Sequence, residues 1–387
     1  MSVPALRTVH LAGSPDRPLL VVGPSLGTRV ERLWGEVATL LAEDFHVVGW
    51  ELPGHGGAPL GERFTIAELA RGVRAAADRV LSRRSAPDGR FAYAGDSVGG
   101  AVGLQLVLDH ADRVDRAALV ATGARIGDAG LWRDRAALVR GSGTTALLAA
   151  AAQRWWAPGF AERAPDIATA LLDDLSAVDA EGYAQVCDAL RDFDVRDRLR
   201  EVRRPLLAIA GAADRTTPVA SLREIAGGAP GARLVELDGI AHLPPVEAPR
   251  AIASLVRDFL AGAGARHVAG MANRRAVLGD AHVDRAIAAG SSLTADFQDL
   301  ITRYAWGEIW DRPGLSRRDR SIAVLTALVA GRHFDELEFH LRAALRNGLS
   351  RDEIIEVLLQ TAIYVGVPAA NTAFGVAARV LDTRDPA

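Results

Sequence analysis

The chain has 387 residues, with 45 basic and 48 acidic side chains, and every basic residue is an arginine. The absence of a lysine amine excludes Schiff-base aldolases, pyridoxal-phosphate enzymes and lysine-bearing phosphate loops. The net charge of −3 gives no overall attraction to nucleic acid or to an anionic membrane. The single cysteine, Cys187, excludes an internal disulfide, a CxxC redox pair and a thiolate metal site.

The N-terminal residues lack the basic and apolar regions of a signal peptide, and the longest apolar stretches are too short to span a bilayer. Apolar residues make up 49% of the chain, which is enough for well-buried cores. The length favours two domains. We therefore expect a soluble, cytoplasmic protein of two domains, with neither nucleic acid nor membrane as a partner.

Six short apolar runs in the first two-thirds of the chain predict β-strands. They alternate with helix-length segments, which is typical of a mostly parallel sheet with right-handed crossovers. The runs are Leu19–Val22, His46–Trp50, Phe91–Ala94, Ala117–Ala121, Leu206–Ala210 and Arg233–Leu237. Residues 125–204 lie between the fourth and the fifth run, contain no convincing strand and predict an inserted helical cap.

A stretch rich in glycine and alanine, residues 261–270, follows the amphipathic helix expected over Pro249–Leu260. Such a composition favours a linker. We therefore place a domain boundary there, with one domain over residues 1–260 and a second over residues 271–387.

The second domain is predicted to be all-α. Strand-like runs disappear, and Ser316 and Ser350 each stand three residues before an acid and just ahead of an apolar run. This is the signature of a capped helix start. Gly348, just before the second start, is typical of a helix end.

The segment Gly95-Asp-Ser-Val-Gly99 has the pattern of a nucleophile elbow. It lies between an apolar run and a helical segment, and its glycines allow a tight, strained turn. Asp214 and His242 each follow a later strand-like run, so the three residues occur in the order of the α/β-hydrolases, each at the carboxyl end of a strand. We predict Ser97 as the nucleophile, His242 as its base and Asp214 as the acid that orients the base.

Two backbone N–H donors should form the oxyanion hole. We expect one from Val98, directly after the nucleophile, and the other from Leu26, in the loop after the first apolar run. His55 is interpreted as a loop residue and not as a catalytic base. Asp96 is interpreted as an elbow residue that is either structural or in contact with substrate, without a catalytic role. Because residue 97 is a serine and not an aspartate, an ester, thioester or lactone is favoured over a halide or an epoxide.

Residues 1–260 resemble the 3-oxoadipate enol-lactonases within the α/β-hydrolases. The matching segments are Ser25–Thr28, Gly95–Gly100, Arg154–Phe160, Glu181–Leu190 and Ala241–Pro249. Such an enzyme opens an unsaturated lactone that carries an acetate side chain and yields 3-oxoadipate.

The resemblance implies an anionic substrate and therefore a cationic contact. In a chain without lysine this contact should be an arginine, whose planar fork fits a carboxylate. We place Ser25, Arg154 and Trp155 at the substrate. For the tryptophan, packing inside the cap is an equally good interpretation.

Residues 271–381 resemble the 4-carboxymuconolactone decarboxylases. The matching segments are Arg275–Asp280, Phe297–Trp310, Leu337–His340 and Gln360–Asn371. The wider superfamily includes alkylhydroperoxidase-type proteins with a CxxC…His arrangement. In this chain the two cysteine positions are His333 and Glu336, ahead of His340, so peroxidase chemistry is excluded.

His333, Glu336 and His340 share one helical face if the helix extends that far. Decarboxylation of the lactone leaves a dienolate that is delocalised onto the lactone carbonyl, so no metal, pyridoxal or thiamine is needed and no cofactor is expected. We expect His340 to be the proton donor or oxyanion partner, supported by the other two. A metal site and a purely structural surface pair remain as alternatives.

Together the two resemblances predict a bifunctional enzyme of the protocatechuate branch of the β-ketoadipate pathway, because the product of the second domain is the substrate of the first. The alternative is a serine esterase or lactonase of other specificity with a non-catalytic helical oligomerisation domain. A redox or binding protein is disfavoured because Cys187 lies in the other domain. The second resemblance also implies a homo-oligomer, a trimer or hexamer, formed through the helical domain.

Overall fold

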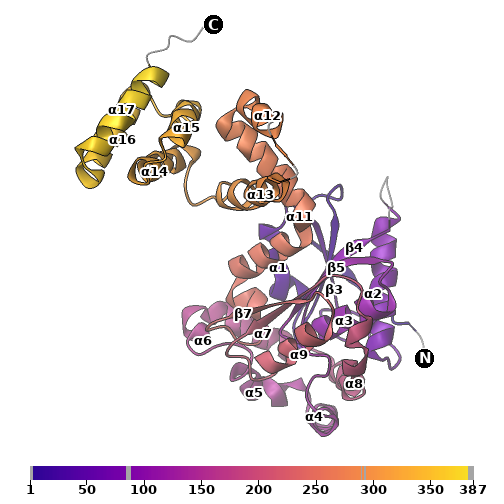
Figure 1. The fold of residues 1–387 in the computed structure, drawn as a ribbon. Coiled ribbons are helices and arrows are strands. Elements are labelled where there is room, and N and C mark those ends of the chain that lie inside the picture. The colour runs from indigo at the N-terminus through magenta and orange to yellow at the C-terminus, as the bar shows by residue number, and fades with distance from the viewer. Residues whose placement is uncertain (1–2, 84–88, 289, 292, 382–387) are drawn as a thin grey trace. The chain divides into compact units, whose positions relative to one another are not determined.

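The computed structural model describes residues 3–83, 89–288, 290–291 and 293–381. The chain forms two compact units, Met1–Leu260 and Ala261–Ala387. The first combines a β-sheet with helices and the second is helical, as predicted (Figure 1). Among the described residues, no helix is both long and apolar enough to cross a membrane.

A seven-stranded sheet with the order β1-β3-β2-β4-β5-β6-β7 lies at the centre of the first unit. The strands β2 to β7 pair in parallel, and β1 pairs with β3 antiparallel. The strands are β1 (Thr8–Ala12), β2 (Leu19–Gly23), β3 (His46–Trp50), β4 (Phe91–Asp96), β5 (Val114–Val120), β6 (Leu206–Gly211) and β7 (Arg233–Leu237). The central strands are continuously apolar because both of their faces are covered.

Strand β1 was not predicted, and β5 begins three residues earlier than predicted. Thr8–Ala12 is an edge strand whose side chains are exposed or half-buried, so it carries no continuous apolar run. In β5, the exposed Asp115 breaks the apolar pattern ahead of Ala117. Both errors follow from the use of continuous apolar runs as the signal for strands.

Helices pack against the sheet and hold its carboxyl end in place. Helix α3 contacts β2, β4 and β5, and α1 contacts β1, β2 and β3. The helices outside the cap are α1 (Val30–Leu40), α2 (Ile66–Leu81), α3 (Val98–Asp109), α9 (Val219–Gly228) and α10 (Pro244–Glu247). Nearly all of α3 is buried, which makes the helix after the predicted elbow part of the core.

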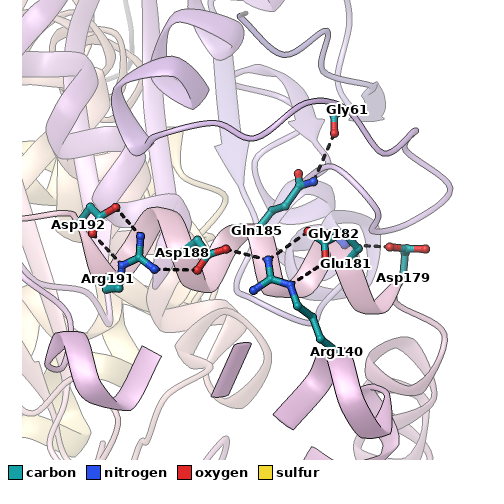
Figure 2. A network of polar contacts seen from close by, with 9 residues as sticks. All are labelled: Gly61, Arg140, Asp179, Glu181, Gly182, Gln185, Asp188, Arg191 and Asp192. Atoms are coloured by element: carbon teal, nitrogen blue, oxygen red, sulfur yellow. Dashed lines mark hydrogen bonds and ion pairs between the residues drawn. The ribbon is translucent and has the colours of Figure 1, made fainter. Parts of the chain in front are cut away.

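The described segment between β5 and β6 contains helices and no strand, as predicted for a cap. Its elements are α4 (Ala129–Ser142), η1 (Thr144–Leu147), α5 (Leu148–Ala152), α6 (Phe160–Arg163), α7 (Pro165–Ser176), α8 (Ala180–Arg191) and η2 (Arg196–Glu201). Figure 2 shows Arg140 of α4 between Glu181 and Asp188 of α8, with donor–acceptor distances of 2.7–3.1 Å. The Arg140 guanidinium thus joins α4 to α8, and both helices supply side chains to the pocket at Ser97.

The expected helix end at Leu260 is wrong. Helix α11 spans Pro249–Leu278 and continues through the predicted linker, residues 261–270. Glycine disfavours a helix by about 1 kcal/mol relative to alanine, but the alanines of this stretch are the best helix formers and no proline interrupts them. The division between the compact units nevertheless falls after Leu260.

The second unit is built from helices with well-defined starts. Beyond α11 they are α12 (Asp280–Ala288), α13 (Ala295–Ile301), the π-helix η3 (Thr302–Ile309), α14 (Arg317–Ala330), α15 (Phe334–Arg346), α16 (Arg351–Val365) and α17 (Val367–Leu381). Ser316 and Ser350 cap α14 and α16 as predicted. Each side chain accepts a hydrogen bond from the backbone N–H three residues later, that of Asp319 or Glu353. Gly348, with φ +96°, follows the end of α15.

Candidate active sites

The turn between β4 and α3 holds Ser97 in a strained conformation. Its φ of 53° is a region that residues with a side chain rarely adopt. The flanking glycines are required by close packing. A Cβ at Gly95 would lie 2.3 Å from the Gly99 carbonyl oxygen, and one at Gly99 would lie 2.7 Å from the Gly23 carbonyl carbon. The elbow therefore presents Ser97 at the carboxyl end of the sheet.

The structure brings the three predicted triad residues together. The Nε2 atom of His242 lies 3.1 Å from the Ser97 hydroxyl oxygen, and its Nδ1 atom lies 2.9 Å from the Asp214 Oδ2 atom. All three side chains are buried. Because Nδ1 faces the carboxylate, the neutral ring keeps its proton there, and Nε2 is left to accept the hydroxyl proton of Ser97.

Asp214 is held as a carboxylate. Burial by itself would raise its pKa, but the charge and hydrogen bond of His242 and the hydrogen bonds from Thr217 outweigh burial and lower the pKa below its ordinary value. Its Oδ1 atom accepts from the backbone N–H groups of Thr216 and Thr217, at 2.7 and 3.1 Å. Asp214 is thereby oriented as well as ionised.

Buried groups that the sequence analysis did not assign to the site fasten the loops around the triad. The Glu247 carboxylate accepts hydrogen bonds from the N–H groups of Ala241, at 2.9 Å, and Ala157, at 2.7 Å. The N–H of His242 donates to the Trp155 carbonyl at 3.1 Å. These bonds tie the histidine loop to the cap. A single glutamate between two prolines offered no sequence pattern that could have revealed them.

The predicted oxyanion loop is fixed from both sides. Gly99 donates its N–H to the Pro24 carbonyl at 3.0 Å, and the N–H of Gly27 donates to Nε2 of His55 at 3.2 Å. Burial lowers the pKa of His55 to about 4, so its ring is neutral and can accept this bond. The other ring nitrogen, Nδ1, faces the Pro53 carbonyl. His55 is thus the buried support of the loop that carries Leu26.

Asp96, next to the nucleophile, is a buried acid. The Ser25 side chain acts on its carboxyl group as a hydrogen-bond donor and offsets the cost of burial only in part. Burial, reinforced by the charge of Asp214, raises its pKa well above the ordinary value. Burial of Asp96 beside the triad therefore disfavours a second negative charge there.

A small pocket lies at Ser97 and contains all the predicted binding residues. Ser25, Leu26, Arg154 and Trp155 line it together with Ser97 and His242. The sequence analysis missed Arg135, Trp132 and Tyr183, which also line it. Trp132 and Arg135 stand one turn apart on α4, so the helical spacing within the predicted cap was the signal that could have found them.

Two guanidinium groups share this pocket. Arg154 donates through Nε to the Ala150 carbonyl at 3.1 Å, and the guanidinium carbon of Arg135 lies 4.9 Å from the ring centre of Trp132. Burial and then the nearby charge of Arg135 lower the pKa of Arg154. Two cations that repel one another in a half-buried pocket favour an anionic ligand.

In the second unit, the expectation that His333, Glu336 and His340 share one helical face is wrong for His333. Helix α15 begins at Phe334, so His333 is the N-cap residue. The preceding residue, Arg332, has a left-handed backbone conformation with φ 58°, so the chain is not helical before His333. Glu336 and His340 do lie on the helix, four residues apart.

His340 is half-buried, whereas Glu336 and His333 are exposed. Burial, followed by the charge of His282, lowers the pKa of His340 to about 4, against the opposing charge of Glu336. His340 is therefore neutral at pH 7 and donates a single N–H. Among the described residues, no group of His, Cys, Asp or Glu side chains is arranged to hold a metal ion, so the geometry lends no support to the metal-site alternative.

The parallel sheet, the strained elbow and the Ser97–His242–Asp214 geometry define a serine hydrolase of the α/β-hydrolase class. Residues 15–248 match the family described as Serine aminopeptidase, S33, and residues 295–379 match the Carboxymuconolactone decarboxylase family. The chain therefore belongs to the α/β-hydrolases over its first unit and to the carboxymuconolactone decarboxylase family over its second.

Individual relatives agree with this division. The chain is 35% identical to 3-oxoadipate enol-lactonase 2 of Acinetobacter baylyi over 62% of its own length and 87% of that protein. It is 43% identical to 4-carboxymuconolactone decarboxylase of the same organism over 30% of its own length and 86% of that protein. The crystal structure of the enol-lactonase from Burkholderia xenovorans superposes with a TM-score of 0.62 and 32% identity, covering 66% of this chain and 96% of that one.

Proposed function

We propose that the chain is a bifunctional enzyme of the protocatechuate branch of the β-ketoadipate pathway. The second unit decarboxylates 4-carboxymuconolactone, and the first hydrolyses the resulting enol-lactone to 3-oxoadipate. The observation that carries the proposal is the joining, in one chain, of a buried serine triad in an enol-lactonase-like unit to a unit 43% identical to a 4-carboxymuconolactone decarboxylase. A cytoplasmic location is consistent with the single, buried Cys187.

In the hydrolytic step, the Ser97 oxygen attacks the lactone carbonyl while His242 takes its proton. The N–H groups of Leu26 and Val98 stabilise the oxyanion, typically by about 3 kcal/mol each. The ring C–O bond then breaks, and His242 protonates the leaving enol oxygen. The enol tautomerises to the ketone, and water hydrolyses the acyl-serine to give the second carboxylate.

The acetate group of the lactone must be held away from the attacked carbonyl. Arg135 and Arg154 are the cations that line the pocket, and Trp155 offers an apolar wall for the ring. We assign the carboxylate to these two guanidiniums. This assignment also accounts for their proximity, since a bound anion offsets the repulsion between them.

In the decarboxylation, the bond from the ring carbon to its carboxylate breaks. The electron pair moves through the ring double bond onto the lactone carbonyl, carbon dioxide leaves and a proton returns to carbon. The substrate is its own electron sink, so protein groups need only stabilise the oxyanion. His340 is our proposed oxyanion partner, through the N–H of its neutral ring, supported by Glu336 and, from the N-cap of α15, by His333, while the proton comes from solvent.

Incubation of the full chain with 4-carboxymuconolactone tests the proposal. We expect one carbon dioxide and one 3-oxoadipate per substrate, with the enol-lactone as a transient intermediate, followed by NMR and by carbon dioxide release. Hydrolysis of added enol-lactone without consumption of 4-carboxymuconolactone would instead support a lactonase with a non-catalytic helical unit.

Replacement of Arg135 or Arg154 by glutamine should raise the KM for the enol-lactone about 10- to 100-fold, with a smaller effect on kcat, because each change removes a charged hydrogen bond to the substrate carboxylate. Steady-state kinetics on the purified enol-lactone measure the effect. Arg133→Gln is the matched control, since Arg133 is an exposed arginine of the same helix, paired with Asp134. Unchanged KM values in both pocket variants would contradict the assignment.

We also propose that the second unit forms a homo-oligomer, a trimer or hexamer. Ile363, Tyr364 and Val367 are 76–81% exposed at the junction of α16 and α17, which is unusual for large apolar side chains. Light scattering after size exclusion should give three or six times the mass of one chain. The double variant Tyr364→Glu/Val367→Glu should lower that mass, and a wild-type monomer at micromolar concentration would overturn the proposal.

A further inference from the structure

A groove between α12 and α15 in the second unit is rich in arginine. Its lining includes His282 and Phe339 together with Arg285, Arg342 and Arg346. We call it the His282 groove. Among the predicted catalytic residues of this unit, His333, Glu336 and His340, none lines it.

Ring contacts connect the groove to His340. The rings of His282 and Phe339 lie 4.6 Å apart between centres, and those of Phe339 and His340 are also 4.6 Å apart. The charge of His282 acts on His340, so the two histidines are electrostatic neighbours. Phe339 thus presents an apolar surface in the groove and touches His340 behind it.

Two arginines are held in place around His282. Arg346 donates to the Leu278 carbonyl at 2.7 Å, at the end of α11. Arg274 is only 6% exposed, and its contact with the Thr302 hydroxyl is long, at 3.4 Å. Arg274 does not line the groove, but its charge acts on His282.

The groove is lined by three acids as well as three arginines, and two of these acids are engaged in ion pairs. Asp280 is paired with Arg275 at 3.0 Å, and Glu338 faces Arg342 at 3.5 Å. Asp335 lies in the first turn of α15, where a carboxylate interacts favourably with the helix N-terminus. Arg285, one helical turn after His282, is exposed and makes no ion pair within the described residues.

Burial and the charges of Arg285, Arg274 and Arg346 lower the pKa of His282. The ring is therefore neutral near pH 7 and can donate one N–H without carrying a proton that the neighbouring arginines would repel. A neutral donor among cations is suited to a carbonyl oxygen that becomes negative during a reaction.

We propose that the His282 groove is the substrate site of the decarboxylating unit and takes a dicarboxylate lactone. Arg285 binds a carboxylate of the substrate, Phe339 packs on the lactone ring, and His282 donates to the lactone carbonyl oxygen. The inference rests on the proposed decarboxylation but makes His282, in place of His340, the donor to the carbonyl oxygen, because His340 does not line the groove.

The proposal places the electron flow in the groove. The bond between the ring carbon and its carboxylate breaks, and its electron pair passes through the ring double bond to the carbonyl oxygen that faces His282. Carbon dioxide leaves, and the dienolate takes one proton from solvent water at carbon to form the enol-lactone. The arginines favour both the bound dianion and the charge that develops on the carbonyl oxygen.

Arg285→Gln and His282→Gln test the proposal in the full chain. Each should lower kcat/KM for 4-carboxymuconolactone about 10- to 100-fold, because each removes a hydrogen bond to a charged or developing anionic group. Hydrolysis of added enol-lactone by the first unit should be unchanged and serves as the internal control for folding. Arg312→Gln, which removes an exposed arginine of the same unit outside the groove, should leave both activities unchanged.

Direct binding separates failure of the groove from failure of the proposed function. Tricarballylate, an unreactive tricarboxylate, is titrated calorimetrically into the Arg135→Gln/Arg154→Gln variant, in which the other pocket has lost its cations. Adding Arg285→Gln should weaken binding at least 10-fold. If the wild type decarboxylates while Arg285→Gln and His282→Gln keep full activity, the groove inference is wrong and the function stands. If the wild type fails to decarboxylate but Arg285→Gln still abolishes binding, the function is wrong and the anion site stands.

Discussion

Replacement of Ser97 by alanine is expected to stop hydrolysis of the enol-lactone, with kcat reduced by about 10⁴-fold or more, because the acyl-enzyme route no longer exists. Decarboxylation by the second unit should continue at the wild-type rate. When 4-carboxymuconolactone is supplied, the enol-lactone should therefore accumulate. The time course by NMR measures both steps in one sample.

Asp214→Asn is the companion to this variant. It keeps the shape of the triad but removes the carboxylate that fixes the tautomer and stabilises the imidazolium of His242, and an effect of about 10⁴-fold is expected for such a change. Thermal unfolding curves should match the wild type for Ser97→Ala. Formation of 3-oxoadipate at the wild-type rate by Ser97→Ala would show that the triad is not the hydrolytic site.

Replacement of His340 by glutamine should have the opposite result. We expect 4-carboxymuconolactone to be consumed about 10²- to 10³-fold more slowly, because the loss of one donor to a developing oxyanion typically costs that much. Added enol-lactone should still be hydrolysed normally. Rates of carbon dioxide release and of enol-lactone hydrolysis, measured on the same preparation, separate the two sites.

His267→Gln is the matched control for this experiment. His267 lies in the same unit, is partly exposed and pairs with Asp299 at 2.9 Å. Its replacement should leave decarboxylation unchanged. Normal turnover by His340→Gln would remove His340 from the mechanism and would favour the His282 groove as the site of decarboxylation.

The strengths and failures of the sequence analysis have a common cause. Buried parallel strands such as β2 and β6 are continuously apolar, so their positions could be predicted from local composition. The edge strand β1 is half-exposed and carries no such run. The glycines of residues 261–270 likewise predicted a linker. The helix α11 continues through them because alanines, which favour a helix, separate the glycines.

Among the predicted site residues, those whose geometry depends on a few neighbouring residues were the ones the sequence could predict. The elbow around Ser97 is local, because its glycines avoid clashes within a few residues, and the order of Ser97, Asp214 and His242 follows from the order of the strands. His333 shows the limit of local reasoning. Its spacing from Glu336 suits a helix, but the left-handed turn at Arg332 delays the start of α15.

By itself, the sequence determined the fold class, the two-part organisation, the serine triad and the restriction of every long cationic side chain to arginine. These features depend on residue type and short-range pattern. Only the tertiary structure decided which arginines meet at a site. Helical spacing places Arg285 beside His282 on α12 and Arg135 beside Trp132 on α4, but it does not say what those faces meet. Arg135 lines the Ser97 pocket because α4 packs on α8, and the face of α12 meets Phe339 of α15. Such meetings are set by packing between elements distant in the chain.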